Sequence, residues 1–192
     1  MRTASAFLAV VQCVGVVCLA ACASSPPMHF YTLSTRTEPR AAGGAAEALP
    51  PIQVARVTLP GEIDRSELVQ RIDDNRLRLA DNDLWAAPLG AMIARTLAED
   101  LRARGARGSG EPERLTVDLE EFIGDARCTV TLRASWSLES PNRSTPPIRG
   151  HESIQENSAG ECSVGVLPQV MSRALAELAD RIAVARMAPR QP

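Results

Sequence analysis

The sequence lacks lysine altogether and has only two histidines among its 192 residues, His29 and His151. Without lysine the chain cannot form the Gly-x-x-x-x-Gly-Lys-Ser/Thr loop that binds nucleotide phosphates in many ATPases. Histidine is the most frequent general acid or base in enzymes, so two histidines leave little scope for such chemistry. We interpret His151 as a surface residue and expect the protein not to be an enzyme.

Aromatic residues are also scarce, at 3% of the chain, and the net charge is only −2. A core with so few aromatic rings must be built from aliphatic side chains. The balanced charge argues against nucleic acid as a partner, because binding phosphates requires a basic face. The length suits one domain with a sizeable core.

The chain has one long apolar run, between Ala4 and Leu19, and this run follows Arg2. It ends at Leu19-Ala20-Ala21, directly before Cys22. Small residues ahead of a cysteine are typical of the lipobox of bacterial lipoproteins. Cleavage would leave Cys22 with a diacylglycerol on its thiol and a further chain, such as palmitate, on its amine, which together make a stable anchor. We predict a lipoprotein signal peptide at residues 1–21. A plain secretory signal peptide and an uncleaved transmembrane helix are the alternatives.

The five cysteines reduce to one candidate pair. Cys13 and Cys18 lie in the signal peptide and Cys22 is the lipidation site, which leaves Cys128 and Cys162. In an oxidising compartment an even pair favours a disulfide, which would close a loop of about 35 residues and contribute on the order of 3 kcal/mol. The alternative is two unpaired, half-buried thiols.

The remaining chain divides into three parts. Residues 22–51 are predicted to form a lipidated N-terminus with a short strand at Met28–Leu33, followed by a flexible linker rich in alanine, glycine and proline at Thr35–Pro51. Residues 52–188 form the single predicted domain, and residues 189–192 are a tail.

Within the domain, alternating or β-rich segments predict six strands, at Ile52–Leu59, Glu67–Ile72, Leu77–Ala80, Leu115–Glu120, Cys128–Leu138 and Ile148–Gln155. The last of these has the weakest pattern and suits a sheet edge. Apolar residues at helical spacing predict helices from Pro88 to Gly105 and from Ser163 to Arg186. We therefore expect an α+β fold: a two-layer sandwich of a mostly antiparallel β-sheet with two amphipathic helices packed on one face.

Four segments stand in a distinctive order behind the lipobox: Phe30-Tyr31-Thr32-Leu33-Ser34, Val57-Thr58-Leu59-Pro60, Ile63-Asp64-Arg65-Ser66-Glu67-Leu68-Val69-Gln70-Arg71 and Leu84-Trp85-Ala86-Ala87-Pro88-Leu89. In this order they resemble the PqiC-type auxiliary lipoproteins of ABC-type transport systems. The resemblance covers most of the chain after the signal peptide.

The resemblance implies a non-enzymatic accessory subunit of an envelope lipid-transport system. Its partners would be an MCE-domain periplasmic protein, a membrane permease and an ATPase carried by another chain. We expect no cofactor beyond the covalent lipid, and a homo-oligomeric ring would match a symmetric partner. Ala23 stands where an aspartate would signal inner-membrane retention, which favours the periplasmic side of the outer membrane.

The candidate partner-binding residues are Asp64, Arg65, Arg71 and Trp85. Asp64 and Arg65 lie in a loop after Pro60-Gly61, where they would form either a contact surface or a local salt bridge that holds the loop. Trp85 would be either a hydrophobic lid on the first helix or a lipid contact.

Other chemistry finds little support. Gly160–Gly165 has Val164 where a nucleophile elbow needs glycine, and Cys162 with His151 would form a nucleophile only if the cysteine were reduced. We predict no metal site, since a hairpin turn and a strand end explain Asp73-Asp74 and Glu120-Glu121. The alternative function is a periplasmic lipid carrier with its own cavity; a thiol-dependent or hydrolytic enzyme is a third.

Overall fold

The structure is a computed structural model that describes residues 26–36, 49–142 and 144–188. The predicted signal peptide, Cys22, most of the linker and the tail at 189–192 lie outside the described residues. The described elements are β1 (His29–Tyr31), β2 (Ile52–Thr58), β3 (Glu67–Asp73), β4 (Arg76–Trp85), α2 (Leu89–Ala103), β5 (Glu113–Asp125), β6 (Thr129–Glu139), β7 (Ile148–Asn157) and α3 (Leu167–Met187).

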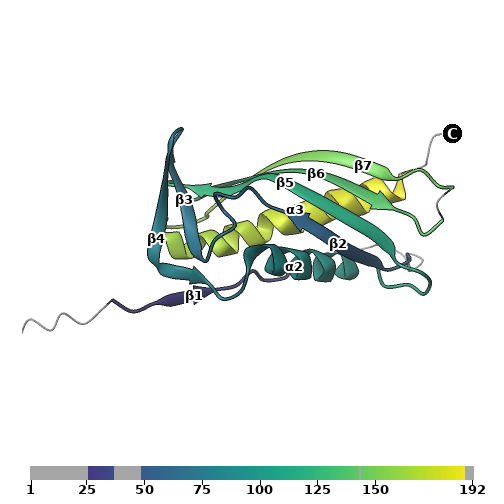
Figure 1. The fold of residues 1–192 in the computed structure, drawn as a ribbon, viewed down its shortest axis with the longest axis horizontal. Helices are drawn as coiled ribbons and strands as arrows, with labels where there is room; N and C mark the ends of the chain where they lie inside the picture. The colour runs from purple at the N-terminus through teal and green to yellow at the C-terminus, as the bar shows by residue number, and fades with distance from the viewer. Residues whose placement is uncertain (1–25, 37–48, 143, 189–192) are drawn as a thin grey trace, which may run out of the picture.

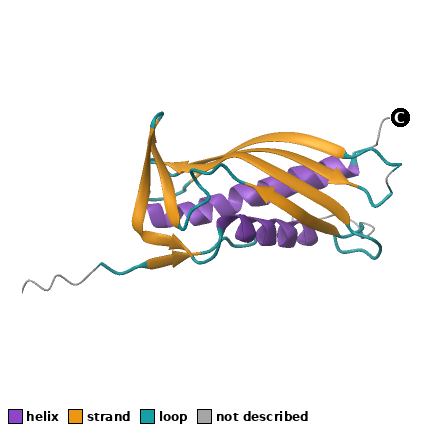
Figure 2. Ribbon diagram, viewed as in Figure 1, coloured by secondary structure: helices purple, strands orange, loops and turns teal. Residues whose placement is uncertain are grey.

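In this part of the chain a seven-stranded sheet is covered on one face by the two helices (Figures 1 and 2). The α+β class and the placement of both helices on one face are therefore confirmed. β7 forms one edge of the sheet, as its weak pattern predicted. β1, which we assigned to the N-terminal segment, pairs with β4 and belongs to the same sheet.

The prediction of a mostly antiparallel sheet was wrong, because the sheet is mixed. Strand order is β1-β4-β3-β5-β6-β7, with β2 beside β5. Pairs β3–β4, β5–β6 and β6–β7 are antiparallel, whereas β1–β4, β2–β5 and β3–β5 are parallel. β5 is 13 residues long, so one of its edges pairs first with β2 and then, near its end, with β3. The chain passes from β2 to β3 without reversing direction, which makes both pairings parallel.

The predicted hairpin around Asp73–Arg76 is confirmed, but its second strand is longer than expected. β4 pairs with β3 as far as Ala80, and the register then jumps so that Glu67 lies opposite Leu84. The residues between Ala80 and Leu84 form an irregularity in β4, and Leu84 then pairs with β3 on one side and with β1 on the other. In Figure 1 the hairpin stands up from the sheet at the same end of the molecule as β1.

The alternation predicted for β6 is confirmed, because Val130, Leu132, Ala134, Trp136 and Leu138 are all buried. The indole of Trp136 lies over Gly150 on β7, where an added Cβ would approach the ring to 2.5 Å. Any larger residue at this position of the edge strand would force the indole or the strand to shift.

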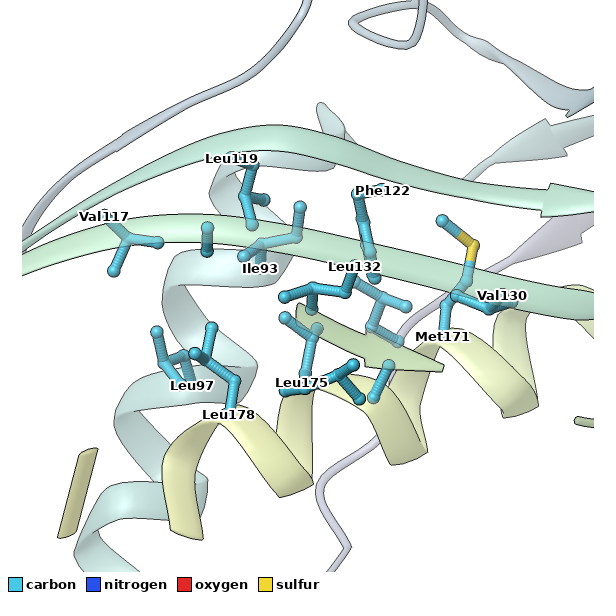
Figure 3. Close-up of a cluster of buried hydrophobic side chains, with 14 of the residues drawn as sticks. Ile93, Leu97, Val117, Leu119, Phe122, Val130, Leu132, Met171, Leu175 and Leu178 are labelled. Carbon is cyan, nitrogen blue, oxygen red and sulfur yellow. The ribbon is translucent and has the colours of Figure 1, made fainter. Parts of the chain in front are cut away.

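The core lies between the sheet and the two helices (Figure 3). The predicted apolar stripe of α2 is buried, and α3 buries a broader face. A short 3-10 turn at Val164–Val166 precedes α3, so the helix begins later than the predicted Ser163. Side chains from both layers meet in Figure 3, among them Ile93, Leu97, Phe122, Leu132 and Leu175. Neither helix of the described chain has the length and apolar character needed to cross a membrane.

Candidate functional site

The loop between β2 and β3 presents Asp64 and Arg65 to solvent. Ile63, beside them, is buried and fixes the loop to the core. The backbone amides of Ile63 and Asp64 donate to the carbonyl of Pro60 at 3.1 and 3.2 Å. The loop is therefore held by its backbone and by one apolar side chain, and the two charged side chains are not needed to hold it.

The salt bridge considered between Asp64 and Arg65 does not form. Arg65 Nε instead lies 3.7 Å from Glu67 Oε2, and both side chains of that pair are partly exposed. An exposed pair of this kind contributes little to stability. Among the residues that the structure describes, no ion pair of Asp64 is seen, so its carboxylate is presented outward.

Arg71, in β3, belongs to a cluster of three charges on the face of the sheet away from the helices. Its guanidinium pairs with Glu121, and Arg133 Nε on β6 binds the other oxygen of the same carboxylate at 2.9 Å. Glu121 is largely buried beneath the two arginines. We call these three residues the Arg71 cluster; its net charge is positive.

A β-bulge creates this cluster. Leu119 pairs with Ala134, but the register then shifts so that Glu121, instead of Glu120, lies opposite Arg133. Strict alternation would have placed Glu121 opposite Leu132. Sequence reasoning therefore missed Glu121 and Arg133, since the only signal was the adjacent acidic pair, which we interpreted as a solvated strand end.

A shallow hollow of about 360 Å³ joins the loop to the cluster. Its lining comes from the β2–β3 loop, the β3–β4 hairpin and strands β5 and β6, and includes Glu62, Ile63, Arg71, Leu77, Glu121 and Arg133. Arg71 and the loop that carries Asp64 and Arg65 are thus brought together. Charges of both signs beside a few apolar side chains suit contact with another polypeptide surface.

Ser135, His151 and Glu120 meet beside this hollow but do not form a catalytic triad. Ser135 Oγ donates to Glu120 Oε1 at 2.7 Å, and His151 Nδ1 lies 3.2 Å from the hydroxyl and 3.4 Å from the carboxylate. In a triad the serine and the carboxylate contact different ring nitrogens, whereas here they share one. The imidazole is 59% exposed, which confirms the prediction that His151 is a surface residue.

Trp85, the fourth candidate residue, is buried in the structure. Its side chain is 7% exposed and belongs to the core, while its backbone amide donates to Ser66 at 2.7 Å. The lid interpretation fits this position. The backbone of Trp85 is thus tied to the end of the candidate loop, and its indole packs in the core.

Cys128 and Cys162 form a disulfide in the structure, with their Cα atoms 5.5 Å apart. The bond joins the turn between β5 and β6 to the segment that leads into α3. Cys162 so bonded has no thiol to act as a nucleophile. In the described residues no group of three or more histidine, cysteine or acidic side chains is placed to hold a metal ion.

A second charged group lies at the interface of the helices. Arg104 Nε binds Asp180 at 2.7 Å, and Arg104 Nη1 lies 3.6 Å from Asp100, which is fully buried. Burial raises the pKa of Asp100, although Arg104 and the backbone amide of Arg36 oppose this effect. The amide of Arg36 donates to Asp100 Oδ1 at 3.1 Å, so this group also holds the segment that follows β1.

Comparison with known proteins places these features in a family context. A family model described as "ABC-type transport auxiliary lipoprotein component" matches residues 31–183. The intermembrane transport lipoprotein PqiC of Escherichia coli (strain K12) is 27% identical over 137 residues, which span 67% of this chain and 73% of that protein.

Two crystal structures share the fold. Protein XCC0632 from Xanthomonas campestris has a TM-score of 0.64 at 15% identity and covers 82% of this chain and 96% of its own. An uncharacterized protein has a TM-score of 0.66 at 18% identity and covers 83% of this chain and 98% of its own. At these identities the likeness shows the fold alone.

Proposed function

Because this chain belongs to the family of ABC-type transport auxiliary lipoprotein components, we propose that it is a lipid-anchored accessory subunit of an MCE-type intermembrane lipid-transport system. The family match over residues 31–183 carries the proposal. The name of the related PqiC, an intermembrane transport lipoprotein, supports the same class of function.

In this proposal the chain docks and does not catalyse. Its partners are an MCE-domain protein and the permease and ATPase that act with it. The covalent lipid on Cys22 anchors it at the periplasmic face of the envelope, on the outer membrane, and the Cys128–Cys162 disulfide suits that oxidising compartment. A ring of several copies would match a symmetric partner.

We assign the docking surface to the exposed Asp64–Arg65 loop and the adjoining Arg71 cluster. The loop is held rigidly by buried Ile63 and by backbone hydrogen bonds to Pro60, so its charges can meet a partner with little ordering cost. Arg71 and Arg133 surround one carboxylate, which leaves donors for acidic groups of a partner.

The carrier alternative would need an apolar cavity large enough for an acyl chain. The hollow beside Arg71 is charged, and a second hollow of about 420 Å³ is lined mainly by polar residues such as Thr32, Ser34, Thr35, Arg36 and Gln169. Neither lining suits an acyl chain, and we do not adopt this alternative.

The test is cross-linked co-purification of the chain from native membranes, with mass spectrometry of proteins and lipids. We compare the wild type with the charge-reversal variant Asp64→Arg/Arg65→Glu. The matched control is Glu139→Arg/Arg149→Glu, which reverses two exposed charges at the far end of β6 and β7.

We expect the wild type and the control to recover an MCE-domain protein and its permease, and the loop variant to lose most of both while remaining folded. Bound lipid without a protein partner would refute the accessory role in favour of a carrier. Equal recovery by all three chains would refute the assignment of the docking surface.

A further inference from the structure

β1 exposes two large apolar side chains, Met28 just before it and Phe30 at its centre, which are 54% and 65% exposed. The other side of β1 carries two polar side chains. Tyr31 Oη donates to Asp83 at 2.8 Å, and His29 Nδ1 lies 3.4 Å from the same carboxylate. Because side chains alternate along a strand, Met28 and Phe30 share the opposite side.

This exposure is distinctive for a chain that is only 3% aromatic. Phe30 lies opposite Leu84 on β4, which is itself half-buried, so the apolar surface extends onto the neighbouring strand. β1 is at the edge of the sheet, and no described element lies beyond it. We call Met28, Phe30 and Leu84 the β1 patch.

The position of the patch in the chain points to what covers it. Only six peptide steps separate Met28 from Cys22, a reach of at most about 20 Å. A lipid on Cys22 would therefore hold the patch close to the bilayer surface. Figure 1 places β1 at one end of the long axis and the C-terminal end of α3 at the other.

The segment after β1 is joined firmly to the helices. Leu33 is buried in the core, and the amide of Ser34 donates to Ser172 Oγ on α3 at 3.1 Å. The amide of Arg36 donates to Asp100 on α2, also at 3.1 Å. The orientation of β1 is therefore transmitted to both helices, and whatever holds β1 orients the whole domain.

We propose that the β1 patch inserts into the boundary between headgroups and acyl chains, so that the domain stands on its β1 end with the C-terminal end of α3 pointing away from the membrane. This inference rests on the lipid anchor in the proposed function. At this depth the apolar side chains of phenylalanine, methionine and leucine leave water, which lowers the free energy of the bound state. The acyl chains would supply the attachment, and the patch would set the angle.

The experiment uses the full lipidated chain in vesicles of phosphatidylethanolamine and phosphatidylglycerol that contain an acyl-brominated phospholipid, which quenches nearby tryptophan. The variant Phe30→Trp reports on the patch. The matched control is Val184→Trp, since Val184 is 63% exposed and lies near the far end of α3. The native Trp85 and Trp136 are buried, and their emission, measured on the wild type in the same vesicles, is subtracted.

We expect the emission added by Phe30→Trp to shift to the blue and to be lost to quenching, whereas that added by Val184→Trp is retained. No quenching at position 30 would overturn the insertion, and cross-linking of that position to a second copy would identify a protein contact instead. Equal quenching at both positions would overturn the upright orientation.

Two further measurements separate this inference from the proposed function. Mass spectrometry of the Cys22 peptide tests the anchor; an unmodified Cys22 would overturn both proposals. Quenching at position 30 in a chain that recovers no MCE-domain protein would support the insertion and reject the docking role.

Discussion

Breaking the Cys128–Cys162 bond tests how the two layers are held together. The residues are 34 positions apart, and the loop between them contains the whole β6–β7 hairpin. In the chain-entropy model a closed loop of this length stabilises the folded state by about 3–4 kcal/mol. For a domain of this size that corresponds to a loss of roughly 10 °C in Tm.

The variant of choice is Cys162→Ala, because Cys162 is exposed whereas Cys128 is fully buried and its replacement would also disturb the core. The control is Ser163→Ala, at the neighbouring exposed position. Urea unfolding of the purified chain, with and without dithiothreitol, measures the free energy of unfolding.

We expect Cys162→Ala to lose about 3–4 kcal/mol, reductant to lower the wild type to the same level, and Ser163→Ala to remain within about 0.5 kcal/mol of the wild type. The reasoning is refuted if Cys162→Ala is as stable as the wild type and if reductant does not change the stability of the wild type. In that case the two cysteines would be a packed pair of thiols.

Three other perturbations test the core and its charges. Burial raises the pKa of Asp100, so the folded state binds its proton more tightly than the unfolded state and stability falls as pH rises through the folded pKa. Asp100→Asn should remove this loss of stability with rising pH. The expectation would be contradicted if the free energy of unfolding changed with pH in parallel in the variant and the wild type. Gly150→Ala should cost about 1–3 kcal/mol, because its Cβ would meet the Trp136 indole at 2.5 Å; an unchanged Tm would show that the ring moves aside. Leu175→Ala, at a fully buried position between the layers, should cost about 2–5 kcal/mol in urea unfolding, and a smaller loss would mean that the core collapses around the gap.

Local patterns in the sequence predicted most elements of the fold. The alternation from Cys128 to Leu138 predicted β6 and its buried side chains, and the four-residue spacing after Pro88 predicted α2. These patterns succeed because each reports which face of one element is buried. They say nothing about which strand lies beside it, and so the parallel pairings of β2 and β3 with β5 were not foreseen.

The candidate site shows the same division. The sequence directed attention to Asp64, Arg65 and Arg71, and the structure places Arg71 in a hollow that is also lined by the loop carrying the other two. Glu121 and Arg133 join them only through a one-residue bulge, for which the sequence carried no separate signal. Trp85 was suggested by its neighbours in the chain, but its burial in the core was decided by the tertiary structure.

The sequence by itself determined the elements, the aliphatic core and the family, because side-chain periodicity and short motifs are written within a few neighbouring residues. Tertiary structure alone decided the mixed sheet, the Arg71 cluster and the exposed β1 patch. Each of these depends on contacts between segments dozens of residues apart, such as Arg71 with Glu121 and Tyr31 with Asp83. The free energy of such a contact depends on both segments together, so the sequence of either segment alone does not predict it.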